Sequence, residues 1–269
     1  MQDQELDFSI VDPTQATAET PAPDLVQLHM QAESDFDEGN YEAALMHYIA
    51  VFEGSRGLAE WQSKRLTILL ADMAALADDY EPAMQALTIM RDQREAALLG
   101  ATIDWTNVNE WAALNRQLAP ERTIETYFKL QANSDQNGPT LSLIRQIESA
   151  QFIRQGLYQE LDQETLAFLQ KKILLHESVL LSQTEADGSS EEEQEEALEK
   201  AIEALLELAL ELFEAAAALN EGDIGRETMH KYLAYQQSAN SYSMLISAAQ
   251  KANNKAWVAG LEKLAADNK

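Results

Sequence analysis

The sequence contains no cysteine, and only 10 glycines and 6 prolines among its 269 residues. The absence of cysteine excludes disulfides, thiolate nucleophiles and cysteine-ligated metals. Half of the prolines lie within the first 23 residues, so helix breakers are especially scarce in the remaining chain. A β-rich fold needs turn residues at short intervals, whereas a helical fold does not. These absences predict an all-α fold.

Basic residues are also scarce. The chain has 46 acidic and 19 basic residues, a formal net charge of −27, and most of the excess lies in residues 1–60 and 185–220. The negative electrostatic field of such a chain repels phosphate backbones and anionic lipids. Neither nucleic acid nor a membrane surface is therefore an expected partner. Two interpretations stay open: an acidic surface for a basic partner, or a solubility trait shared by the proteins of the host.

No apolar run reaches the roughly 18 residues that a bilayer requires. The longest candidate, residues 202–219, is interrupted by four glutamates. The first eight residues are acidic, with no basic segment followed by an apolar one, which argues against a secretory signal. We therefore expect a cytoplasmic protein.

The apolar residues recur at helical spacing along most of the chain. Asp24 is a suitable N-cap for a helix over residues 24–37, a turn at Gly39 and Asn40 follows, and a second helix covers residues 41–52. Two helices joined by so short a turn are expected to pack antiparallel.

Further helices follow the same pattern. They are predicted over residues 58–77, 82–99, about 104–117, 120–131, 140–155, 157–182, 191–219, 223–250 and 253–266. The polar segment 133–139, which ends in Gly-Pro, indicates a loop and the best internal boundary. The expected organisation is an acidic disordered tail at 1–23, helical hairpins at 24–132, and a C-terminal helical region at 140–269 with a linker at 183–190.

Part of the first hairpin resembles a tetratricopeptide repeat. Gly39, Tyr41, Ala44 and Tyr48 match the positions of glycine, aromatic, alanine and aromatic in the second helix of that repeat, and Ala32 fits the small position of the first helix. The resemblance extends over about residues 25–98. It implies a tetratricopeptide-like α-solenoid of antiparallel hairpins, with additional C-terminal helices that carry no repeat motif.

The resemblance also implies a concave surface that binds a peptide or a partner protein without chemistry of its own. Some members grip a carboxylate through Lys and Arg on the first repeats, but residues 24–55 of this chain contain neither. A basic or amphipathic partner therefore fits better, and we expect Glu33, Asp35 and Glu38 to take part in binding it. Trp105 is the tryptophan expected to be exposed and to serve as a further contact.

The sequence shows no catalytic, cofactor-binding or metal-binding motif. Phosphate-binding glycine loops and the serine hydrolase elbow are absent. His29 and Glu33 are four residues apart, a spacing that metal ligands on a helix use. A histidine near one carboxylate is common on an acidic surface, so we interpret His29 as a packing residue and expect no metal or cofactor.

We therefore expect a non-enzymatic protein-interaction module or scaffold. Two alternatives stay open: an acidic neutraliser or chaperone of one basic partner, such as a toxin or a secreted substrate, and an enzyme that uses a carboxylate pair. The glutamate-rich helix 191–219 could also mediate self-association through its apolar stripe. Packing of that stripe within the same chain explains it more simply, and the imperfect heptad regularity favours this interpretation.

Overall fold

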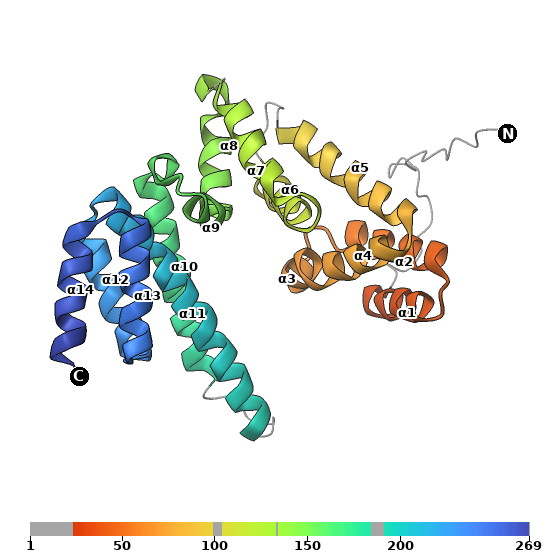
Figure 1. The fold of residues 1–269 in the computed structure, drawn as a ribbon. Helices are drawn as coiled ribbons and strands as arrows, with labels where there is room; N and C mark the ends of the chain where they lie inside the picture. The colour runs from red at the N-terminus through yellow and green to blue at the C-terminus, as the bar shows by residue number, and fades with distance from the viewer. Residues whose placement is uncertain (1–23, 99–103, 133, 184–190, 269) are drawn as a thin grey trace. The chain divides into compact units, whose positions relative to one another are not determined.

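The computed structural model describes residues 24–98, 104–132, 134–183 and 191–268. Every regular element in these stretches is helical (Figure 1), which confirms the all-α prediction. The expected tail at 1–23 lies outside the described residues. So does the expected linker, except for Gln183, the last residue of a helix.

The chain divides into two compact units, of which the first ends at Met84 and the second begins at Gln85. The helices of the first unit, in chain order, are α1 (Leu25–Asp37), α2 (Tyr41–Gly54), the 3₁₀ turn η2 (Ala59–Trp61), α3 (Gln62–Leu66) and α4 (Ile68–Asp79). Helix α5 (Glu81–Leu98) begins in the first unit and continues into the second.

The first two helices form the expected hairpin. The Asp24 carboxylate accepts hydrogen bonds from the backbone N–H groups of Val26 and Gln27, as an N-cap does. Gly39 has a φ of +78°, a conformation that glycine adopts without steric cost, and it ends α1. Ala32 and Ala44 are fully buried. The hairpin is therefore confirmed, while tetratricopeptide-like packing of residues 25–98 stays a prediction.

The prediction of a single helix over residues 58–77 is wrong. The helix is interrupted at Thr67, whose φ and ψ are −120° and −82°. The Thr67 hydroxyl donates to the Ser63 carbonyl, which also accepts from the Thr67 N–H, and a side-chain bond of this kind often bends a helix. Arg65, just before the break, is buried. Its Nε donates to the Phe52 carbonyl at 2.6 Å and its guanidinium lies over the Phe52 ring.

The second unit contains the rest of the helices. In chain order they are α6 (Trp105–Leu118), α7 (Pro120–Gln131), α8 (Ser134–Ile147), α9 (Ser149–Arg154), the 3₁₀ turn η3 (Tyr158–Glu160), α10 (Gln163–Gln183), α11 (Glu191–Leu219), α12 (Gly222–Tyr235), α13 (Ala239–Lys251) and α14 (Lys255–Asp267). One hydrophobic core runs from α6 to α14, and its largest wholly buried side chains are Trp111, Tyr127, Phe152 and Phe213.

The prediction of a loop at 133–139 is also wrong for the described residues of this segment. Helix α8 begins at Ser134 and contains Pro139. The Asn137 amide donates to the Leu130 carbonyl at the end of α7. Farther along α8, Leu141 and Ile144 are buried in the core. Burial of this apolar face offsets the loss of the backbone hydrogen bond that the proline cannot make.

Three of the later helices predicted from the sequence are shorter than expected. The segment 140–155 is divided at Glu148, and α10 begins at Gln163 rather than at residue 157. The Asp162 carboxylate accepts from the N–H and the hydroxyl of Thr165, so it caps α10. The segment 223–250 is divided into α12 and α13, and Ser238 caps the second of these. Local capping residues account for two of these three differences.

The long helix α11 has the predicted bounds. It ends where Asn220 adopts a φ of +60°. Its C-terminal half is surrounded by α10, α12 and α13 (Figure 1), and Leu205, Leu212 and Phe213 are buried there. This packing within the chain explains much of its apolar stripe, and self-association through residues 191–219 stays a prediction. In the described part of the chain, no helix has the length and apolar character to cross a membrane, and the cytoplasmic location stays a prediction.

Candidate functional site

A groove lies between the middle of α11, residues 199–210, and the helices α12 and α13. Its volume is about 830 Å³. On the α11 side it is lined by Ile202, Leu206 and Leu210, which are four residues apart and therefore lie on one face of the helix. The opposite side contains Tyr232, Tyr235 and Met244 from α12 and α13, together with the polar residues Gln236 and Asn240.

The apolar lining is only partly covered. Tyr235 and Met244 keep 41% and 42% of their surface exposed, which is high for large apolar side chains. Ile202, Leu206 and Leu210 are half-buried. Exposed apolar surface collected in one concave place is typical of a binding site rather than of scattered surface residues.

One edge of the groove is negatively charged. Glu199, Glu203 and Glu207 line it, all are exposed, and their spacing of four places them along one side of α11. The groove also contains Lys200, but its ammonium lies 2.6 Å from the carboxylate of Glu196 on the same helix. The groove thus combines an apolar floor with a row of three glutamates.

The negative charge continues toward the bundle at Glu211. Burial, and next the charge of Glu207, raise the pKa of the Glu211 carboxyl, while Arg154 and Lys172 act in the opposite direction. Burial also lowers the pKa of Lys172. Glu211 thus lies between the exposed glutamates of α11 and the cations Arg154 and Lys172.

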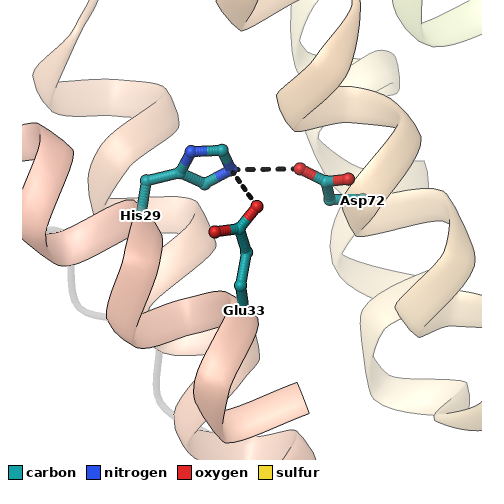
Figure 2. Close-up of side chains that lie close together, drawn as sticks. All are labelled: His29, Glu33 and Asp72. Atoms are coloured by element: carbon teal, nitrogen blue, oxygen red, sulfur yellow. Dashed lines mark hydrogen bonds and ion pairs between the residues drawn. The ribbon is translucent and has the colours of Figure 1, made fainter. Parts of the chain in front are cut away.

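A second cluster, in the first unit, is formed by His29, Glu33 and Asp72 (Figure 2). His29 and Glu33 lie one turn apart on α1, and Asp72 comes from α4. The His29 Nε2 lies 3.0 Å from Asp72 Oδ2 and 4.0 Å from Glu33 Oε1. Figure 2 shows the imidazole directed at both carboxylates through this one nitrogen.

Aromatic side chains surround this histidine. The rings of Tyr48 and Trp61 contact the imidazole edge-on, with centroids 6.0 and 6.3 Å away. The pKa of the Tyr48 hydroxyl is raised by burial and then by the charges of Asp72, Glu33 and Asp37. Tyr48 is therefore held in its neutral form beside a concentration of carboxylates.

Three carboxylates of the first hairpin were predicted to contact a partner, and their environments in the structure differ. Asp35 is 8% exposed, and its carboxylate is 2.8 Å from His47 Nδ1 and 3.2 Å from the amide of Gln31. It is thus engaged inside the hairpin. Glu33 and Glu38 are exposed, and Glu38 accepts from the side chain of Asn40. Whether a partner contacts these residues stays a prediction.

Trp105 is 38% exposed at the start of α6. Trp61 and Trp111 are buried and Trp257 is intermediate, so the expectation that Trp105 is the exposed tryptophan is confirmed. Its ring contacts Phe168 of α10 edge-on at 6.2 Å. A role of Trp105 in binding stays a prediction.

Buried carboxylates are present, as the enzyme alternative requires, but the two most deeply buried ones are bound to arginines. Glu110 is fully buried and its Oε2 lies 2.6 Å from Arg94 Nε. Glu148 is bonded to Arg116, although burial still raises its pKa. Removal of one partner from such a buried pair is destabilising, because it leaves an uncompensated charge.

Sequence reasoning missed the groove because it considered a single apolar stripe on α11. Leu206 and Leu210, together with Ile202, form a second stripe at a spacing of four, and this spacing was available in the sequence. Asp72 carried no such signal, since it lies 43 residues from His29. A comparison of the chain with protein-family models, curated proteins and solved structures finds no match.

Proposed function

We propose that this protein is a non-enzymatic interaction module that binds a basic, amphipathic helical segment of a partner protein in the groove between α11, α12 and α13. The supporting observation is the combination of an apolar floor with the row Glu199, Glu203 and Glu207. An amphipathic helix that carries Lys or Arg beside its apolar face would bury that face on the floor and place its cations against the glutamates.

The length of the glutamate row fits this occupant. The three glutamates cover two helical turns, about 12 Å along the axis, which is the length that anchors at positions i, i+4 and i+8 of a bound helix cover. The proposal keeps the basic or amphipathic partner expected from the charge of the chain. It assigns the contact to the second unit rather than to Glu33, Asp35 and Glu38.

An amphipathic peptide tests the proposal. The probe is a fluorescein-labelled helical peptide of 18 residues, with leucines on one face and lysines along its flanks, titrated with the full-length chain and followed by fluorescence anisotropy. The decisive variant is Glu199→Lys/Glu203→Lys/Glu207→Lys. It should weaken binding by about tenfold or more, because it replaces attraction by repulsion at the site of contact.

The matched control carries the same change of net charge elsewhere. Glu42, Glu60 and Glu121 are exposed glutamates outside the groove, and their triple replacement by lysine should weaken binding by about threefold or less at 150 mM salt, where charges beyond about 8 Å are screened. Equal losses in both variants would show that the peptide responds to the bulk charge alone, and the proposal would then be wrong.

The apolar floor has its own test. Tyr235→Ala and Met244→Ala remove exposed apolar side chains, so they should change the stability of the fold little while each weakens peptide binding about fivefold. Circular dichroism checks the fold. Binding that is unchanged in both variants would leave the groove without a role.

A further inference from the structure

We infer that His29, Glu33 and Asp72 form a binding site for one divalent transition-metal ion, with Zn²⁺ as the representative ion. One imidazole nitrogen and two carboxylates are ligands that Zn²⁺ accepts. The sequence alone offered only the pair His29 and Glu33. The fold adds Asp72 from a second helix (Figure 2), which completes a set of three ligand atoms within 4.8 Å of one another.

The distances agree with this assignment. Ligand atoms held tetrahedrally at 2.0–2.2 Å from one Zn²⁺ ion lie about 3.3–3.6 Å from each other. His29 Nε2 and Asp72 Oδ2 are 3.0 Å apart, so they have to separate by roughly half an ångström to admit the ion. Glu33 Oε1 is 4.0 Å from the same nitrogen, so it has to approach by roughly half an ångström. The side chain of Glu33 is 53% exposed, which leaves it free to make this movement.

The charge at the site favours a cation. Among the described residues, the ion pairs of Glu33 and Asp72 both lead to His29, and neither carboxylate pairs with Lys or Arg. When His29 is neutral, two negative charges therefore share one small volume beside the buried Tyr48. A divalent ion would neutralise both.

The site is also held in position before any ion binds. His29 is 18% exposed and packs between the rings of Tyr48 and Trp61. In binding, the Nε2 lone pair of the neutral imidazole is donated to the ion, and the ring carries its one proton on Nδ1. The three ligands leave at least one coordination position for water.

The nearby pair His47 and Asp35 provides an internal control. It is also a histidine bound to a carboxylate, at 2.8 Å, in the same hairpin. Its third neighbour is the amide of Gln31 and not a second carboxylate. A histidine and a single carboxylate bind Zn²⁺ weakly, so this pair should not form a site.

The test is isothermal titration of ZnCl₂ into the full-length chain after treatment with a chelator. The unmodified chain should bind one Zn²⁺. His29→Gln, Glu33→Gln and Asp72→Asn should each weaken this binding about tenfold or more, whereas His47→Gln and Glu38→Gln should leave it within about twofold. Glu33→Gln and Glu38→Gln form the sharpest comparison, because both replace an exposed glutamate of the same segment and neither endangers the fold.

Two further measurements locate the ion. Zn²⁺ should raise the unfolding temperature of the unmodified chain, since the ion ties α1 to α4, and it should not do so for Glu33→Gln. Co²⁺ should quench tryptophan fluorescence, and Trp61→Phe should remove most of that quenching because the ring of Trp61 contacts His29. Weak binding of several ions that is the same in Glu33→Gln and Glu38→Gln would overturn the assignment, as would the absence of saturable binding.

Discussion

Gly225 of α12 faces the indole of Trp257 of α14 so closely that a Cβ atom at residue 225 would lie 2.9 Å from Cζ2 of the ring. The same indole packs edge-on against Phe213 of α11, at a centroid distance of 5.1 Å. Glycine at position 225 thus allows the tryptophan to enter the space between three helices. These helices include two of the three that form the proposed binding groove.

The contact leads to a prediction with a control in the same unit. Gly225→Ala should destabilise the chain by about 1–3 kcal/mol, because the new methyl group overlaps the indole. Gly260→Ala should instead stabilise it by about 0.5–1 kcal/mol, since a Cβ there meets nothing within 4 Å and alanine is the better helix former. Urea unfolding measures both. A neutral or stabilising effect of Gly225→Ala would contradict the close packing.

The buried pair Arg94 and Glu110 gives a second prediction. Arg94→Met keeps the apolar stem but leaves the carboxylate of Glu110, which is fully buried, without that guanidinium. We expect a loss of about 3 kcal/mol in the free energy of unfolding. Arg91→Met should cost less, because its partner Asp92 is 49% exposed and can be hydrated. Equal losses in the two variants would show that burial of the carboxylate does not decide the cost.

The pH dependence of stability should reveal Glu211. Its pKa in the folded chain is raised above the ordinary 4.5 by burial and by Glu207. The folded state therefore holds the proton more tightly than the unfolded state, and this contribution to stability is present below pH 4.5 and is lost as the pH rises through the folded pKa.

Ionisation of Glu211 is consequently less favourable in the folded chain than in the unfolded chain. Glu211→Gln should therefore stabilise the chain at pH 7, and the gain should shrink as the pH falls toward 4. Glu195→Gln, on the exposed part of α11, should show little change at either pH. Thermal or urea unfolding across this range provides the data, and a gain that persists unchanged at low pH would mean that burial of charge is not its cause.

Helix ends with a strong local signal were predictable from the sequence. Asp24, Gly39 and Asn220 stop or start helices through their own side chains or backbone, and the bounds of α1 and α11 agree with the prediction. The prediction failed where tertiary packing competes with local preference. Asn137 and the buried Leu141 maintain a helix around Pro139, although proline and its polar neighbours favour a loop.

The candidate sites were less accessible from the sequence. In the sequence, Asp35 cannot be distinguished from the neighbouring surface acids. In the structure its carboxylate is hydrogen-bonded to His47 and Gln31 inside the hairpin. Asp72 joins His29 only because α4 packs near α1, and no spacing rule connects residues in different helices. The row Glu199, Glu203 and Glu207 was visible as a pattern. Tyr235 and Met244, which line the same groove from later helices, could not be connected to this row from the sequence.

The most direct test of the proposed function is hydrogen exchange of the full-length chain with and without the amphipathic peptide, read by mass spectrometry. Binding in the groove predicts added protection in residues 199–210 of α11 and in the segment from Tyr232 to Met244, and none in α1 and α2. Protection confined to α1 and α2, where Glu33 and Glu38 lie, would contradict the groove and return the contact to the first hairpin.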